Sequence, residues 1–324
     1  MTKQANQVTQ ARLNVRERFD EKIRGSIGMK KWRRIKGFLR MVPFLIFIFA
    51  FEYVPLLGWL YAFCDFKPGQ RWDVFNWVGL KHFMRFFTDR DVFRVLRNTL
   101  AMNLLELLLT PMPVLFAIFF NDIRNKKTKK VVQTITTMPH FISWIIVFGL
   151  SQAIFDANGL LNQVIKLLGG TPSPFGLMGD GNHVWLFQVL LGLWKGLGWS
   201  TIVYMAAITG LDQELYDAAK VDGANKVQTI RYITIPVIAP TYLVLLLLKV
   251  SNLLNSGFDQ YYQFYNSLVA DKIEVLEYYI YRVSFGGGQY SFGIAVGILQ
   301  SLVAILLLFI TNAIAKKVRG NAIV

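Results

Sequence analysis

The sequence predicts an all-α membrane protein that crosses the bilayer about six times. Of its 324 residues, 54% are hydrophobic and only 17% are charged. Several apolar runs exceed about 18 residues, the length that a helix needs to cross a hydrocarbon core of about 30 Å. Of the 35 Lys and Arg, 23 fall in segments that we assign to the cytoplasm and 10 in segments outside. This bias places both termini in the cytoplasm, so the net charge of +15 indicates membrane topology and not a nucleic-acid partner.

Residues 1–37 form a basic cytoplasmic tail ahead of the first apolar run. Ala11, Val15, Phe19 and Ile23 recur every four residues among charges. This pattern fits a helix that lies on the anionic inner leaflet, and it also fits a solvated basic tail. The tail lacks the apolar core of a cleavable signal, so the first span is expected to be an uncleaved anchor.

The membrane domain is expected over residues 38–320. A wet aromatic stretch at 65–99 is expected to form an amphipathic surface helix outside the membrane, and 156–183 and 259–290 are expected to be external as well. The expected spans lie near 41–64, 99–121, 131–155, 184–210, 236–258 and 291–315.

A polar stretch at 211–236 separates two of these apolar runs. Asp212 is placed to cap a helix, Gly223 to end it in a left-handed turn, and Asn225 to begin a second helix. Pro236 is expected to open the next span at its first turn. The stretch is therefore expected to be a helix–turn–helix elbow at the membrane surface. Its small side chains would allow another protein to approach closely.

This elbow resembles the coupling loop of the membrane subunits of bacterial ATP-binding-cassette importers, which carries a Glu-Ala-Ala motif. Asp217-Ala218-Ala219, Gly223, Ile233, Ile235 and Pro236 stand at the spacing of that motif. Asp217 replaces the usual Glu, and Ile235 replaces the usual Leu, so charge or bulk is kept. The resemblance implies that the loop contacts a separate ATPase through Asp217, Ala218, Ala219, Asp222, Gly223, Ala224, Ile233 and Pro236.

The resemblance extends from about residue 38 to 320, toward the oligosaccharide permeases of the lipoprotein/polysaccharide (Lpl) and alginate or rhamnogalacturonan importers. It implies the type I importer permease architecture in the bacterial cytoplasmic membrane. It also implies a second homologous permease, a cytoplasmic ATPase dimer and an external solute-binding protein. The similar segments are Tyr53-Val54-Pro55 with Gly58 and Ala62-Phe63, Asn76-Trp77-Val78-Gly79-Leu80, Leu193 to Trp199, Gly257 to Gln260, Tyr279 to Arg282 and Tyr290 to Gly293.

No catalytic or metal-binding constellation is visible. No Gly-rich loop ends in Gly-Lys-Ser/Thr, and the three histidines (His82, His140 and His183) are too scattered to form a metal set. We therefore expect no enzyme chemistry and no cofactor in this chain, with ATP and magnesium held by the partner ATPase. The alternative function is a stand-alone channel or secondary transporter for a polar solute, which would need broken helices or an inverted repeat.

A saccharide path needs hydrogen-bonding groups and aromatic faces between the spans. The candidates for hydrogen bonding are Asn103, Glu106, Lys195, Lys249, Asn252 and Asn255. The aromatic candidates are Trp144 and Trp194. Each of these side chains could instead serve helix packing, and an acidic sugar would favour Lys195 or Lys249 facing the path.

Overall fold

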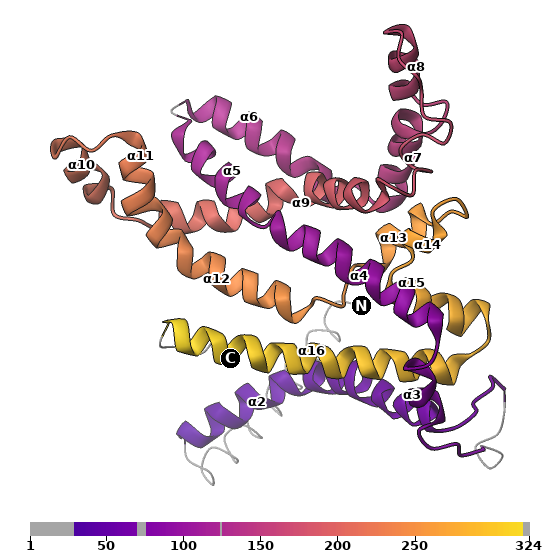
Figure 1. Ribbon diagram of the computed structural model, residues 1–324. Helices are drawn as coiled ribbons and strands as arrows, with labels where there is room; N and C mark the ends of the chain where they lie inside the picture. Colours follow the sequence, from indigo (N-terminus) through magenta and orange to yellow (C-terminus); the bar gives the residue numbers. More distant parts are fainter. Residues whose placement is uncertain (1–28, 70–75, 124, 320–324) are drawn as a thin grey trace, which may run out of the picture. The chain divides into compact units, whose positions relative to one another are not determined.

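The computed structural model describes residues 29–69, 76–123 and 125–319, which are almost wholly helical (Figure 1). Outside the helices, the described residues form one isolated antiparallel bridge, between Cys64 and Trp77. The chain divides into a unit of residues 1–60 and a unit of residues 61–324. The apolar stripe expected in the tail, Ala11 to Ile23, lies outside the described residues.

The described residues of the first unit form one long helix with three hydrogen-bonding patterns. Helix α2 (Met29–Ile48) continues into a π-helical turn, η1 (Phe49–Tyr53), and then a 3₁₀ segment, η2 (Val54–Phe63). Pro55 has no backbone N–H to give to an α-helical ladder, so a change of pattern at this point is expected. None of the residues in the most apolar window of Arg34–Phe63 is buried within the chain.

The second unit contains the remaining helices. In chain order they are α3 (Lys81–Phe86), α4 (Arg90–Leu108), α5 (Pro111–Asp122), α6 (Lys126–Thr137), η4 (Met138–Phe141), α7 (Trp144–Phe155), α8 (Leu160–Leu167), α9 (Val184–Thr209), α10 (Gln213–Val221), α11 (Lys226–Thr229), η5 (Ile230–Thr234), α12 (Ile235–Ser251), α13 (Phe258–Phe264), α14 (Ala270–Ile273), α15 (Leu276–Tyr281), η6 (Arg282–Gly286) and α16 (Tyr290–Arg319).

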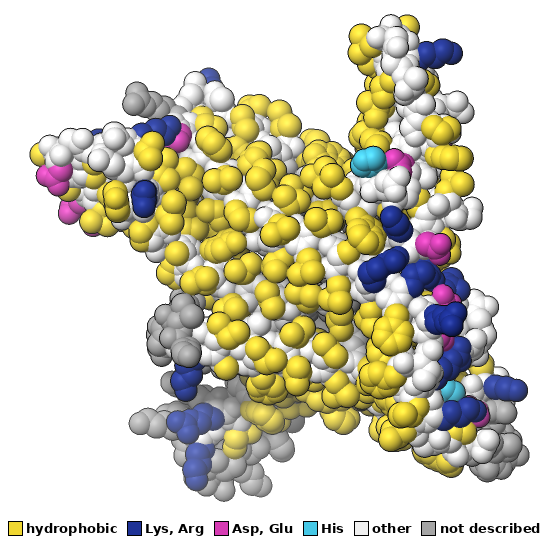
Figure 2. Space-filling model, viewed as in Figure 1, with side chains coloured by type: hydrophobic (Ala, Val, Ile, Leu, Met, Phe, Trp, Pro, Cys, Tyr) yellow, Lys and Arg dark blue, Asp and Glu magenta, His cyan; other side chains and the backbone are white. Residues whose placement is uncertain are grey.

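Six helical segments among the described residues are long and apolar enough to span a membrane, which agrees with the predicted fold class. They are Arg34–Phe63, Arg90–Asp122, Trp144–Leu167, Val184–Thr209, Lys226–Ser251 and Tyr290–Lys316. Figure 2 shows hydrophobic side chains gathered over the middle of the long helices of the second unit and charged side chains gathered toward their ends.

Several element boundaries differ from those expected. The helix of span two begins at Arg90 and not near residue 99, because Asp89 caps it by accepting the N–H of Asp91. Among the described residues of 65–99, this early start leaves the six-residue α3 in place of the expected surface helix. Span five ends as a helix at Ser251 and not near residue 258.

The expected single span at 131–155 is wrong, because the helix is divided into α6 and α7. The 3₁₀ turn η4 separates them, and Pro139 in that turn cannot continue an α-helical ladder. Helix α6 packs closely on α9: a Cβ placed on Gly198 would collide with the backbone of Thr136. The third candidate span accordingly begins at Trp144 and continues through α8.

The buried core lies mainly at the end of the second unit that holds α13, α14 and α15. Its largest hydrophobic cluster includes Met102, Val147, Phe187 and Phe264, which come from α4, α7, α9 and α13. A separate cluster lies nearer the elbow, with Ile238 of α12 packed among residues of α5 and α9. The core therefore fixes one end of the bundle firmly, and α12 connects that end to the elbow.

Candidate functional site

The elbow has the helix–turn–helix form expected from the sequence. Asp212 caps α10 by accepting the N–H of Glu214 at 3.1 Å. Gly223 adopts the left-handed conformation (φ 75°), which ends α10 without the steric cost that a Cβ would add. Asn225 then starts α11 in a capping box with Gln228, with hydrogen bonds of 2.9 and 2.7 Å.

The second arm of the elbow and span five form one continuous helix. Helix α11 passes through the π-helical turn η5 into α12 without a break, so Pro236 lies inside a helical segment that starts ten residues earlier. Lys226–Ser251 contains 26 residues and is therefore about 39 Å long. An ion pair of 2.8 Å between Lys226 and Asp122 holds its first turn to the end of α5.

The motif residues of the elbow are accessible to a partner. Asp217, Ala218, Asp222, Gly223 and Pro236 are exposed, and the other three expected contact residues are half-buried. A Cβ added to Gly223 would meet no atom within 4 Å. Large apolar side chains are exposed beside them, at Val221 (88%), Val227 (72%) and Tyr232 (69%). Such exposed apolar side chains beside small ones form a surface that suits a protein partner.

A cavity of about 420 Å³ lies between α4, α5, α9 and α12. Glu106 and Lys249 line it, and the Lys249 Nζ donates to Glu106 Oε2 at 2.9 Å. Thr110, Ser200 and Tyr204 add hydroxyl groups to an otherwise apolar lining. The structure thus brings two of the predicted path residues together at one cavity. The hydroxyls were missed, because single Ser, Thr and Tyr residues in an apolar run carry no sequence signal of their own.

Lys195 and Trp144 meet near the helix break at η4. The Lys195 Nζ donates to the carbonyl of His140 at 2.8 Å and lies 5.4 Å from the centre of the Trp144 ring. Among the described residues, no carboxylate lies within ion-pair distance of Lys195. The His140 ring stacks on Trp199, with centroids 4.6 Å apart, which is a packing role.

The three predicted asparagines lie around the end of α12. Asn103 donates to Ser256 Oγ at 2.7 Å, which ties α4 to the segment that follows α12. Asn255 donates to Asn252 Oδ1 and accepts from Gln300 of α16 at 2.6 Å. These amides form a second polar group, separate from the lining of the cavity.

Trp194 is the predicted path residue that the structure leaves apart. Its side chain is 44% exposed on α9. It does not belong to the lining of the cavity. The structure therefore does not bring it together with the other aromatic candidate, Trp144.

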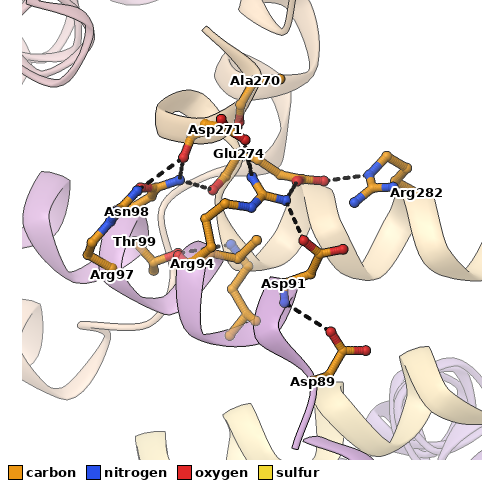
Figure 3. Close-up of polar contacts among 12 residues, drawn as sticks. Asp89, Asp91, Arg94, Arg97, Asn98, Thr99, Ala270, Asp271, Glu274 and Arg282 are labelled. Carbon is orange, nitrogen blue, oxygen red and sulfur yellow. Dashed lines mark hydrogen bonds and ion pairs between the residues drawn. The ribbon is translucent and has the colours of Figure 1, made fainter. Parts of the chain in front are cut away.

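A buried carboxylate clamps the external segment onto the start of α4 (Figure 3). The Glu274 side chain is 1% exposed and binds Arg94 at 2.7 Å and Arg282 at 2.5 Å. Asn98 donates to the carbonyls of Asp271 and Glu274. This clamp could not be predicted from local sequence, because Arg94 and Glu274 are 180 positions apart.

The chain is similar to known membrane components of transport systems. Residues 95–320 match the family described as "Binding-protein-dependent transport system inner membrane component". The polygalacturonan/rhamnogalacturonan transport system permease protein YteP of Bacillus subtilis is 38% identical over 284 residues, 86% of this chain and 87% of the relative. Protein LplB of the same organism is 38% identical over 282 residues, 86% of this chain and 88% of the relative.

Solved structures agree in fold. A chain of a bacterial ABC transporter involved in the import of the acidic polysaccharide alginate matches with a TM-score of 0.81 at 31% identity, covering 90% of this chain and 99% of that chain. A second structure of a bacterial alginate transporter, in complex with an alginate pentasaccharide-bound periplasmic protein, matches with the same TM-score at 30% identity.

Proposed function

The chain belongs to the family of binding-protein-dependent transport system inner membrane components, and we propose that it forms half of the translocation path for an acidic oligosaccharide. It is the membrane-spanning permease subunit of an ATP-binding-cassette importer, a multi-pass protein of the bacterial cytoplasmic membrane, and not an enzyme. The family removes the alternative of a stand-alone channel or secondary transporter. What remains to be assigned is the chemistry of the solute and the role of each side chain.

The observation that carries the proposal is Lys195, which lies within a span and has no carboxylate among the described residues to neutralise its charge. Lys195 is held by a backbone carbonyl and an indole ring, with no acidic partner among the described residues. An unpaired cation at membrane depth is costly and is usually retained for function. A carboxylate of a passing sugar would supply the missing counter-charge. The named substrates of the relatives, polygalacturonan, rhamnogalacturonan and alginate, include acidic polysaccharides, which supports the same assignment.

The cavity beside Glu106 and Lys249 suits such a solute. It combines a cation, a carboxylate and hydroxyl groups within an apolar lining, as saccharide sites require. The asparagines at the end of α12, Asn252 and Asn255, would contribute hydrogen bonds on the external side of the cavity. We assign Asn103 and Trp194 no direct contact with the sugar, because the first is committed to Ser256 and the second does not line the cavity.

The rest of the importer follows from the elbow and from the family. A second permease would complete the path, and an external binding protein would deliver the solute, as the periplasmic protein accompanies the alginate transporter. A cytoplasmic ATPase dimer would hold ATP and magnesium and receive the elbow. Because α11 and α12 are one helix, movement of the ATPase would be transmitted along it to the cavity wall.

The test is import by the reconstituted assembly of both permeases, the ATPase and the binding protein in liposomes. Galacturonate oligosaccharides are compared with the same oligosaccharides after reduction of their carboxyl groups. We expect ATP-dependent uptake of the acidic form and a loss of about tenfold for the reduced form, since one charged hydrogen bond is worth roughly 1.5–3 kcal/mol. Equal uptake of both forms would show that the charge of the sugar does not matter. Uptake without ATP would contradict the assignment as an ATP-driven importer.

A further inference from the structure

A continuous row of aromatic rings lies at the end of the second unit away from the elbow. It consists of Phe258, Tyr262, Tyr281, Phe285, Tyr290 and Phe66, and we call it the aromatic track. Successive ring centroids in that order are 5.1, 5.6, 5.3, 5.7 and 6.2 Å apart. Such spacings are those of rings in direct contact, so the track is continuous.

Helical periodicity explains how the track is displayed. In α13, Phe258 and Tyr262 lie one turn apart on the accessible face, whereas Tyr261 and Phe264 point inward and are 1% and 2% exposed. The same alternation in α15 buries Tyr279 at 2%. The buried rings anchor both helices in the core and hold the accessible rings in place.

The composition of the accessible face argues against a lipid contact. Tyr262, Tyr281 and Phe285 are 44%, 37% and 66% exposed, and between residues 256 and 290 the only other large exposed hydrophobic residue is Leu268. The exposed face of the long span α16 carries one aromatic residue, Phe309, and is otherwise aliphatic, with Leu302, Val303, Ile305, Leu306, Ile310 and Ile314. Tyrosine-rich surfaces present both apolar ring faces and hydroxyl groups, which suits a partner with both kinds of surface.

The track begins at the polar end of α12. Phe258 follows Asn255 by three residues, and Asn255 is hydrogen-bonded to Asn252 and Gln300. The proposed path of the solute also passes this end of α12. The track therefore continues from that path onto the external surface.

Cationic groups border the track. The Arg282 Nε is bound to Glu274, but its two terminal nitrogens make no hydrogen bond among the described residues. Arg85 lies beside the other end, where its Nη1 donates to Gln289 at 2.6 Å, its Nε pairs with Asp89 at 3.4 Å and its guanidinium lies over the Phe292 ring at 4.1 Å. The side chains of Arg282 and Arg85 are 40% and 44% exposed. A chain of sugar rings that carry carboxylates matches this pattern, with ring faces on the aromatic side chains and carboxylates toward the guanidinium groups.

We propose that the aromatic track binds the successive rings of an acidic oligosaccharide at the external mouth and leads them to Asn252 and Asn255. The proposal rests on the proposed function, because it needs a saccharide as the solute. Contact of this surface with a second permease or with the binding protein would be a different result of the test.

The experiment uses the complete reconstituted importer with a Tyr262→Leu, Tyr281→Leu double variant, and with Phe175→Leu as the matched control. Phe175 is 53% exposed in the external segment between α8 and α9 and is not part of the track. Uptake of a galacturonate hexasaccharide and of a disaccharide is measured, together with ATP hydrolysis stimulated by the binding protein. We expect hexasaccharide uptake at limiting concentration to fall about tenfold in the double variant, with a smaller loss for the disaccharide and none in the control.

Each other outcome overturns the proposal in a distinguishable way. Unchanged hexasaccharide uptake removes the track, and lost ATPase stimulation would assign the surface to the binding protein. Failure of the two permeases to assemble would assign the surface to the subunit interface. In that case a Tyr262→Phe, Tyr281→Phe variant, which keeps both rings, is tested. The proposal then holds only if this variant imports the hexasaccharide normally. If the unaltered importer takes up no saccharide, the proposed function itself fails.

Discussion

The Lys249 ammonium lies 2.9 Å from a carboxylate oxygen of Glu106, although 143 positions separate the two residues. The pair joins α4 to α12 at the wall of the cavity. Lys249 is two residues from the end of the helix that begins in the elbow. A movement of the elbow along this helix would therefore act directly on the ion pair. The ion pair therefore lies on the helix that connects the elbow to the cavity.

The Lys249→Met variant should be destabilised, because Glu106 is left without its counter-charge within the membrane. The pair is partly accessible from the cavity, so we expect a loss of roughly 1–3 kcal/mol, between the values for exposed and fully buried pairs. Thermal unfolding of the purified complex measures it. Adding Glu106→Gln should restore most of the stability but not the import of an acidic sugar. If the double variant is no more stable than the single one, the pair makes no contribution.

The Gly223→Leu variant should insert normally and lose coupling to the ATPase. A side chain at this exposed position would stand between the elbow and its partner, and loss of one hot-spot contact of an interface costs about 2 kcal/mol or more, about thirtyfold in affinity. We therefore expect ATP hydrolysis that no longer responds to the binding protein. Uptake and stimulated ATPase activity of the reconstituted importer are the measurements.

Gly169 provides a matched control for backbone strain. It follows α8 on the external side, has φ 77°, and has no atom within 4 Å of an added Cβ, as is also true of Gly223. Gly169→Leu should therefore carry the same cost of about 1–2 kcal/mol for a left-handed residue and keep full coupling. Equal losses in both variants would show that strain, and not contact with the ATPase, explains the effect at Gly223.

The elbow and the number of spans could be predicted because their signals are local. The cap at Asp212, the turn at Gly223 and the length of an apolar run each involve neighbouring residues. The division of span three could not be read with the same certainty, since Pro139 is compatible with either a kinked helix or a break. The backbone of Thr136 fits against Gly198 of a different span, and such a contact leaves no mark in local sequence.

The polar side chains between the spans were predicted as a set but not as pairs. Lys195 and Lys249 look alike in sequence, as single lysines in apolar runs. Their partners, a backbone carbonyl and Glu106, are decided by how α9 and α12 pack against other elements. The clamp at Glu274 was missed for the same reason, because its burial depends on contacts with α4.

The Glu274→Gln variant should loosen the external segment 259–290. Glutamine keeps the shape but leaves Arg94 and Arg282 without the charge that the buried carboxylate supplies. We expect a loss of about 3 kcal/mol, the lower end of the range for breaking a buried pair. Limited proteolysis of this segment and thermal unfolding both report it. Asp271→Asn is the control, since that side chain is 90% exposed and 3.9 Å from Arg94, and it should change neither measurement.

The stability of the external end should fall with rising pH because of Glu277. Burial raises the pKa of Glu277 above its ordinary value of 4.5, although a hydrogen bond from the Gly257 backbone opposes this. A carboxyl with a raised pKa binds its proton more tightly in the folded state. Its contribution to stability is therefore complete below pH 4.5 and is lost as the pH rises through the folded-state pKa. Glu277→Gln should flatten the dependence of the melting temperature on pH between 4.5 and neutrality, while Asp259→Asn, an exposed acid on α13, should leave it unchanged. An unaltered pH profile in Glu277→Gln would mean that other groups set the dependence.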